Sequence, residues 1–184
     1  VRVDTGNSQY RLIFDCGESV LAGLGFSELQ QNDELFFSHF HIDHIAGFDS
    51  FLRVNYDRPE KKVRVWGPKE ALSILSHRLQ GFTWNLVKDN PCVWEIREIQ
   101  EENIYHTFHY TAEGFSVAHD YGSSPWNGII LDNPFFQIKA LTLLHGIPSI
   151  GYLLEEKSKI NIDKDKLSLL SLEPGPWLKK VKDY

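Results

Sequence analysis

Three histidines and one aspartate stand within six residues of one another in the first quarter of the chain. The stretch reads Ser38-His39-Phe40-His41-Ile42-Asp43-His44, so its spacing is H-x-H-x-D-H. Neutral imidazole and carboxylate are good ligands for zinc and similar divalent metals. Crowding four such groups without a cation wastes desolvation free energy and invites charge repulsion. The stretch therefore predicts a metal site. The alternative is a surface loop with unrelated histidines, which is the better interpretation of a lone histidine than of this full pattern.

The flanking residues indicate that this stretch is a loop between a strand and a helix. Residues 34–37 form a short apolar run with strand character, and residues 45–53 carry apolar side chains at helical spacing. His39 and His41, two apart on an extended segment, would point the same way. The aspartate and the last histidine would lie at the turn into the helix and face the same cavity. One loop could then supply two metals about 3.5–4 Å apart, the usual arrangement for hydrolysing phosphate esters.

Two further positions are candidates for the same site. Asp15 ends an apolar strand over residues 10–15, where its carboxylate can orient a ligand histidine as a hydrogen-bond acceptor. A simple turn or capping role for this aspartate is equally open. His145 ends another apolar strand and is followed by a proline-containing turn and a further strand. Its position makes it a candidate fifth metal ligand.

The elements that must position these side chains alternate between helix and strand in the first half, and strands dominate the second half. We expect helices over 19–30, interrupted at Gly23 and Gly25, and over 69–79, and strands over 63–66, 93–99, 115–119 and 135–141. A chain of 184 residues with this pattern is one α/β domain by length.

Composition excludes several classes of protein. Hydrophobic residues make up 42% and charged residues 24% of the chain, as in an ordinary globular protein. No apolar run reaches the length of about 18 residues that a transmembrane helix needs, so we expect no membrane contact. The net charge of −6 argues against nucleic-acid binding through bulk charge, although a local basic patch stays open. Cys16 and Cys92 are the only cysteines and suggest no disulfide framework, which favours a reducing, cytoplasmic location.

Residues 156–184 form a distinct last segment. Asp163 is well placed to cap a short helix, and Pro174-Gly175-Pro176 is a stiff turn. An aromatic face then stands beside three cations: Trp177, Lys179, Lys180 and Lys182. This combination suits a phosphate backbone or an unpaired base. The alternative is an ordinary basic segment.

These stretches together resemble a known family. The H-x-H-x-D-H loop resembles the signature of the metallo-β-lactamase superfamily. Residues 14–18, 39–44 and 145–152 are similar, in order and context, to ribonuclease Z, the tRNA 3′-processing endonuclease family. Residues 173–180 resemble the glycine-proline segment of that family's tRNA-gripping arm. The resemblance implies an α/β (α+β) fold, a four-layer αββα sandwich with a dinuclear metal site at one edge of its two sheets.

Carried onto this chain, the resemblance implies that His39, His41 and His145 bind one zinc ion and that Asp43 and His44 bind the other. Asp43 would also accept the proton of the attacking water. The complete site would hold two zinc ions, and manganese or iron would accept the same ligands. In the family a first glycine-rich strand precedes these motifs, and the remaining ligands and the leaving-group histidine follow the arm. We therefore expect residues 1–184 to be the first part of one such domain, incomplete at both ends, with 156–184 as an RNA-contacting arm segment.

The function implied by the resemblance is removal of the 3′ trailer of precursor tRNA, by hydroxide attack at the dinuclear zinc site of a homodimeric endoribonuclease. The first alternative is another hydrolase that uses the same metal loop, such as a cyclic-nucleotide phosphodiesterase, a lactonase or a thioesterase. The second alternative is a non-catalytic tRNA-binding or structural module that keeps half a metal site.

Overall fold

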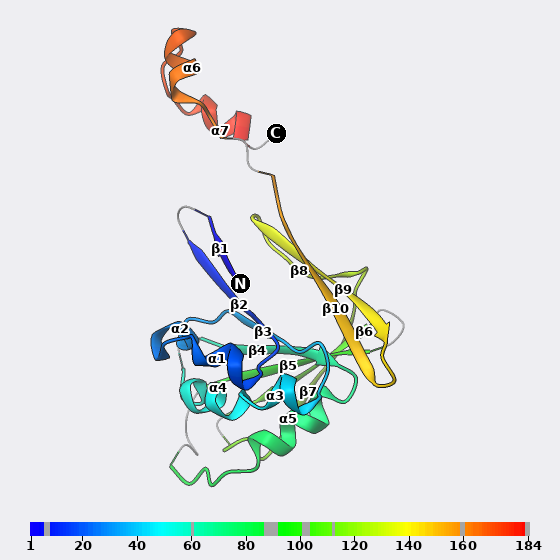
Figure 1. Ribbon diagram of the computed structural model, residues 1–184. Helices are drawn as coiled ribbons and strands as arrows, with labels where there is room; N and C mark the ends of the chain where they lie inside the picture. The colour runs from blue at the N-terminus through cyan, green and yellow to red at the C-terminus, as the bar shows by residue number, and fades with distance from the viewer. Residues whose placement is uncertain are drawn as a thin grey trace.

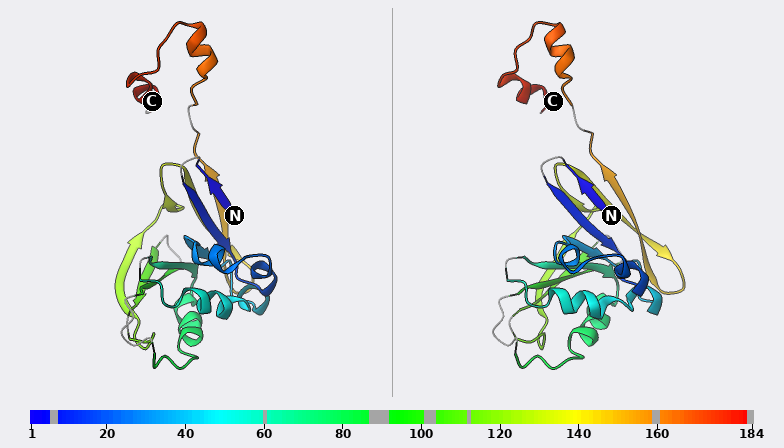
Figure 2. Two further views of the ribbon diagram at one scale, coloured as in Figure 1. Left: turned by 90° about the vertical axis from the view of Figure 1, so that its left-hand side faces the viewer. Right: turned by 60° about the vertical axis from the view of Figure 1, so that its left-hand side comes forward.

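Two β-sheets form the centre of the molecule, and helices cover one of them. The computed structural model describes residues 1–5, 8–59, 61–86, 92–100, 104–111, 113–158 and 161–182. The larger sheet has the order β1-β2-β3-β4-β5-β6-β7, and the smaller has the order β10-β9-β8. Figure 1 shows α1 to α5 gathered against the larger sheet, and Figure 2 shows the smaller sheet leaning away from them.

The larger sheet consists of β1 (Arg2–Asp4), β2 (Gln9–Phe14), β3 (Glu34–Phe36), β4 (Val63–Pro68), β5 (Trp94–Gln100), β6 (Ile104–Tyr110) and β7 (His119–Pro125). The smaller sheet consists of β8 (Ile129–Asp132), β9 (Phe136–Leu144) and β10 (Pro148–Glu156). The helices are α1 (Glu18–Ala22), α2 (Phe26–Gln30), α3 (Ile42–Ile45), α4 (Phe48–Asn55), α5 (Ala71–Leu79), α6 (Lys164–Leu169) and α7 (Trp177–Lys182). Among the described residues, no helix is long and apolar enough to cross a membrane.

Parallel pairing in the middle of the larger sheet brings the chemically interesting loops to one edge. β2, β3, β4 and β5 are parallel neighbours, with Phe14 opposite Phe36 and Phe36 opposite Trp66. The carboxyl ends of parallel strands lie at the same edge of a sheet. Asp15 directly after β2 and Ser38 shortly after β3 are consequently neighbours, and the Ser38 amide donates to Asp15 Oδ1 at 2.7 Å.

Alternation along the strands divides the apolar side chains between two cores. Neighbouring residues of a strand point to opposite faces, so Leu35 and Val65 face the helices while Phe36 and Trp66 face the smaller sheet. The first core lies between the larger sheet and helices α1 to α5, and the second lies between the two sheets. The larger sheet is therefore buried on both faces at its centre.

Most of the predicted elements are confirmed. The expected strands are present as β2 (expected over 10–15), β3 (34–37), β4 (63–66), β5 (93–99) and β9 (135–141). The expected helices are present as α1 with α2 (19–30), α3 with α4 (45–53) and α5 (69–79). Asp163 caps α6, where its side chain accepts hydrogen bonds from the amides of Asp165 and Lys166 at 3.0 and 3.2 Å.

The strand predicted over 115–119 is wrong. Phe115 has a left-handed backbone with φ 60 and is buried in the first core, which turns the chain out of an extended path. Residues 116–118 have no regular structure, and β7 begins only at His119. The apolar pattern arose because Phe115 fills the core from a turn, and the sequence alone does not separate that case from a strand.

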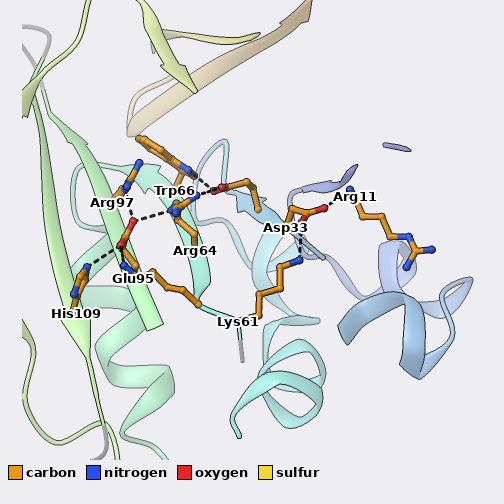
Figure 3. A network of polar contacts seen from close by, with 10 residues as sticks. Arg11, Asp33, Lys61, Arg64, Trp66, Glu95, Arg97 and His109 are labelled. Carbon is orange, nitrogen blue, oxygen red and sulfur yellow. Dashed lines mark hydrogen bonds and ion pairs between the residues drawn. The ribbon is translucent and has the colours of Figure 1, made fainter. Parts of the chain in front are cut away.

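A ladder of charged side chains crosses the face of the larger sheet that looks toward the smaller sheet (Figure 3). Glu34, Arg64, Glu95 and His109 lie opposite one another on β3, β4, β5 and β6. Glu95 is 3% exposed and contacts Lys62 at 2.8 Å, Arg64 at 2.8 Å, Arg97 at 2.6 Å and His109 at 2.9 Å. A buried carboxylate is costly unless it is paired, and the observed register of the four strands provides these partners.

The ladder predicts a specific loss of stability in acid. Burial alone would raise the pKa of Glu95, but the hydrogen bond from Lys62 and the charges of Arg97 and Arg64 hold it at about 2, against an ordinary value of 4.5. A depressed carboxyl pKa stabilises the fold above pH 4.5, and this contribution disappears as the pH falls toward 2. We expect the wild-type free energy of unfolding to fall by about 3 kcal/mol through this group across that window.

Urea unfolding followed by tryptophan fluorescence at several pH values tests this expectation. Glu95→Gln should be less stable than the wild type at pH 7 by about 3 kcal/mol and should show a shallower dependence on pH below 4.5. Glu156→Gln is the matched control, because that residue is exposed at the end of β10 and should leave the profile unchanged. An equally steep acid slope in Glu95→Gln would contradict the assignment.

Candidate metal centre

The loop after β3 is held between the two sheets by backbone hydrogen bonds. The Phe37 amide donates to the Trp66 carbonyl at 2.8 Å, which ties the start of the loop to β4. The Ile150 amide donates to the Ser38 carbonyl at 2.8 Å, and the Tyr152 hydroxyl donates to the Phe37 carbonyl at 2.9 Å. The loop is thus fixed from β4 on one side and from β10 on the other before its histidines begin.

Three of the predicted ligands converge on one point. Within the part of the chain that the structure describes, His39, His41 and His145 are the one set of three or more His, Cys, Asp or Glu side chains whose ligand atoms all lie within 4.8 Å of one another. His39 Nε2 is 3.1 Å from His41 Nδ1. His145 enters from the turn between β9 and β10, where Gly146 adopts φ +75, a conformation that suits glycine.

This donor set fits a divalent metal. Three imidazole nitrogens that lie within 4.8 Å of one another are a donor set typical of a zinc site. Burial lowers the pKa of His39, and the neighbouring imidazoles of His44 and His41 lower it further. His39 is therefore favoured in its neutral form, which is the form that binds metals.

Asp43 and His44 lie beside this group at the start of α3. His44 Nε2 is 3.6 Å from Asp43 Oδ2, and the His44 ring lies 3.9 Å from the His39 ring, centre to centre. The side chain of Asp43 is 77% exposed, so its carboxylate is open to water. Among the described residues, no third His, Cys, Asp or Glu joins this pair. Metal binding by Asp43 and His44 stays a prediction.

Asp15 lies directly behind the histidines. Its backbone is left-handed with φ 57, which aims the carboxylate back at the loop after β3. Its oxygens accept hydrogen bonds from the Ser38 amide and hydroxyl, both at 2.7 Å, and one of them lies 2.8 Å from His44 Nδ1. The structure thus places Asp15 where the predicted orienting role requires it.

Two glycines allow the turn after β2 to press against the metal loop. A Cβ atom on Gly17 would lie 2.3 Å from the Asp43 carbonyl oxygen, and one on Gly47 would lie 2.8 Å from the Cys16 carbonyl oxygen. Hydrogen bonds join the same backbones, from the Cys16 amide to the His44 carbonyl and from the Gly47 amide to the Cys16 carbonyl, both at 2.8 Å. Burial raises the pKa of the Cys16 thiol to about 12, so this cysteine acts as a small apolar side chain.

The residues predicted from the sequence fall into two groups. The structure brings together Asp15, His39, His41, Asp43, His44 and His145. It does not bring the predicted RNA contacts to them, because Trp177, Lys179 and Lys180 lie on α7, beyond the end of β10 (Figures 1 and 2). The side chain of Lys182 lies outside the described residues.

Sequence reasoning missed Ser38. Its hydroxyl contacts the Asp15 carboxylate and also lies 3.0 Å from His39 Nδ1. The one signal for it was its place directly before the first histidine, and a serine at that position carries no distinctive spacing. Gly17 and Gly47 were missed as close-contact positions for a similar reason, because only the folded chain shows which backbones meet there.

Comparison with known proteins agrees with this geometry. The chain is 43% identical over 183 residues to ribonuclease Z of Deinococcus radiodurans, which covers 99% of this chain and 55% of that protein. It is 28% identical over 174 residues to ribonuclease Z of Methanocaldococcus jannaschii, covering 93% and 46%. The chain thus spans about half the length of the relatives it matches.

Two solved structures are also similar. The metallo-β-lactamase fold protein YhfI of Bacillus subtilis matches with a TM-score of 0.47 and 18% identity, over 84% of this chain and 48% of that one. The short form of human tRNase Z matches with a TM-score of 0.47 and 18% identity, over 85% and 56%.

The fold, the histidine group and the relatives define the class of this protein. It has the α/β metallo-β-lactamase fold and is similar to ribonuclease Z, as the sequence predicted. A family model described as "Anti-Pycsar protein Apyc1" matches residues 4–142, and the chain belongs to that family.

The backbone contact at Gly17 generates a prediction about the site. Gly17→Ala places a methyl group against the Asp43 carbonyl, which is backbone and has little freedom to move. We expect a loss of about 1–3 kcal/mol in the free energy of unfolding. We also expect zinc binding to weaken at least about tenfold, because the start of α3 must shift.

Chemical unfolding and zinc titration measure the two effects. Gly23→Ala is the matched control, since nothing lies within 4 Å of a Cβ atom added at that glycine of the same segment. Its stability should change by less than about 0.5 kcal/mol. Equal behaviour of the two variants would show that the close contact at Gly17 does not hold the site together.

Proposed function

We propose that this chain belongs to a metal-dependent phosphodiesterase that cleaves RNA and removes the 3′ trailer of precursor tRNA. The observation that carries the proposal is the extent of the likeness to the Deinococcus ribonuclease Z. That likeness runs over 99% of this chain, so it includes both the metal loop and the arm of residues 156–184. The proposal extends to a homodimer, as the resemblance implies, and to a cytoplasmic location, as the two free cysteines favour.

The proposed roles are those that the resemblance implies, and the positions of the side chains support them. His39, His41 and His145 would hold one metal ion, and Asp43 and His44 would hold a second, with zinc as the proposed metal and manganese or iron as alternatives. A bound divalent metal lowers the pKa of a coordinated water and neutralises charge on a phosphate. The exposed carboxylate of Asp43 is free to accept the proton of the attacking water.

The arm supports an RNA substrate. Trp177 is 38% exposed, and Lys179 and Lys180 follow it on α7. An exposed indole beside lysines offers a stacking face for a base and positive charge for phosphates. The arm extends beyond β10, away from the two sheets, so it can contact a substrate much larger than a mononucleotide (Figure 2).

A second candidate is a cyclic-nucleotide phosphodiesterase. The match to the Apyc1 family favours it, and that match covers residues 4–142, which include the metal loop and exclude the arm. A small cyclic substrate would need the metal centre and no arm. The two candidates therefore differ in whether residues 156–184 matter for turnover.

A substrate panel separates these functions. We expect the complete protein, purified with zinc or manganese, to cut precursor tRNA at the start of its 3′ trailer and to leave cyclic nucleotides, lactones and thioesters intact. His41→Ala should reduce cleavage to background, because it removes a donor of the histidine group. His77→Ala, an exposed histidine on α5, is the control and should cleave normally.

Other results of the substrate panel would each support a different function. Hydrolysis of cyclic nucleotides with intact precursor tRNA would replace the proposal by the second candidate. Turnover of a lactone or thioester alone would place the protein among other hydrolases of the fold. Tight tRNA binding with no turnover of any substrate would indicate a non-catalytic module.

The arm gives a prediction of its own. Replacing Lys179 and Lys180 together by alanine should raise KM for precursor tRNA and lower the salt dependence of binding by about 1–2 in log–log slope, since two phosphate contacts are lost. Hydrolysis of bis(p-nitrophenyl) phosphate should not change, because that substrate is too small to reach α7. Lys139→Ala, a lysine of β9 on the smaller sheet, is the control. An unchanged KM for tRNA would remove the arm from the proposal.

A further inference from the structure

One hydroxyl group lies between the Asp15 carboxylate and two of the candidate ligands. Ser38 Oγ is 2.7 Å from Asp15 Oδ2, 3.0 Å from His39 Nδ1 and 3.4 Å from His44 Nδ1. The Ser38 amide also donates to the other carboxylate oxygen at 2.7 Å, so the carboxylate is fixed in orientation. The serine thus touches both the orienting acid and the ligands.

Counting protons assigns the direction of these hydrogen bonds. A serine hydroxyl has one proton to donate and two lone pairs, whereas an ionised carboxylate can only accept. The contact at 2.7 Å between Ser38 and Asp15 needs that single proton, so the hydroxyl donates to Asp15. Its lone pairs are then left to accept, and the imidazole facing them at 3.0 Å is His39, which must carry its proton on Nδ1.

The same carboxylate acts directly on the second imidazole. His44 Nδ1 lies 2.8 Å from Asp15 Oδ2, closer than its 3.4 Å contact with Ser38, so His44 donates to Asp15 itself. Both histidines are then protonated on Nδ1 and present Nε2 with a free lone pair. His39 Nε2 lies in the three-histidine group, and His44 Nε2 faces Asp43.

We propose that Ser38 is a positioning residue whose hydroxyl links the Asp15 carboxylate to His39 by two successive hydrogen bonds. One acid would then fix the tautomer of a ligand histidine in both groups of the site. Asp15 acts directly on His44 and through the Ser38 hydroxyl on His39. The two candidate metal positions are thereby coupled through a single side chain. The consequence for metal binding rests on the proposed function, whereas the tautomers do not.

Nitrogen-15 NMR of the histidine rings in the metal-free protein tests the hydrogen-bond assignment directly. The chain has eight histidines, and the chemical shifts of Nδ1 and Nε2 identify the tautomer of each. In the wild type, His39 and His44 should both be protonated on Nδ1. A His39 ring protonated on Nε2 would overturn the proposal whatever the variants do.

Variants then separate positioning from a merely structural role. Ser38→Ala should release His39 into a mixture of tautomers while His44 keeps its Nδ1 proton, and Ser38→Thr should restore the wild-type spectrum because it keeps the hydroxyl. Asp15→Asn should disturb both rings. Ser50→Ala, an exposed serine on α4, is the matched control and should change nothing.

Zinc titration completes the test. Loss of the Ser38 hydroxyl should weaken zinc binding by about 10–100-fold, with recovery in Ser38→Thr. Unchanged tautomers and unchanged affinity in Ser38→Ala would overturn the inference and leave the proposed nuclease untouched. If the wild type shows the expected tautomers but does not cleave RNA, the proposed function is contradicted and this inference is not.

Discussion

The close contact between two backbone segments is the constraint on which the rest of the site depends. The turn after β2 and the loop after β3 meet where Gly17 lies against the Asp43 carbonyl and Gly47 lies against the Cys16 carbonyl. A side chain at either glycine would push the segments apart. Held together, they allow Asp15 to reach Ser38 and His44 with hydrogen bonds of 2.7 and 2.8 Å. The parallel pairing of β2 and β3 brings Asp15 beside Ser38, and the two positions that lack a Cβ atom let the start of α3 approach closely enough for His44 to reach the same carboxylate.

The larger sheet carries ion-paired carboxylates near one end of its strands and candidate metal ligands beyond the other end. The buried carboxylates of Glu34 and Glu95 lie toward the amino ends of β3 and β5, where arginine and lysine side chains neutralise them and the His109 ring hydrogen-bonds to Glu95. The candidate metal ligands follow the carboxyl end of β3. A strand of three residues, Glu34–Phe36, thus connects an ion-paired ladder to the metal loop, and its register with β4 serves both.

The sequence predicted the local features of the site and failed on those that depend on tertiary packing. The spacing of His39 to His44, the strand before it and the capping residue Asp163 are local patterns, and the structure agrees with them. The role of Ser38 was not predictable, because a hydroxyl has no preferred spacing and its partners are 23 residues upstream and one residue downstream. The ladder was equally hidden, since only strand register places Glu34 opposite Arg64 and Arg64 opposite Glu95. Phe115 misled the prediction because a core residue in a left-handed turn looks the same in sequence as a core residue in a strand.

The two groups of candidate ligands depend on different parts of the fold. Asp43 and His44 need only the larger sheet and its helices, because α3 is held by the turn after β2. His145 comes from the smaller sheet, and its place is set by the β9–β10 pairing and by the hydrogen bond from the Ile150 amide to the Ser38 carbonyl. The three-histidine group can therefore form only when the inter-sheet core of Phe36, Trp66 and Ile150 is packed. A change that loosens this core displaces His145 directly, whereas it reaches the Asp43–His44 pair through intermediate contacts of His44 with Asp15, Ser38 and His39. The three-histidine group is therefore the more sensitive reporter of whether the two sheets are correctly docked.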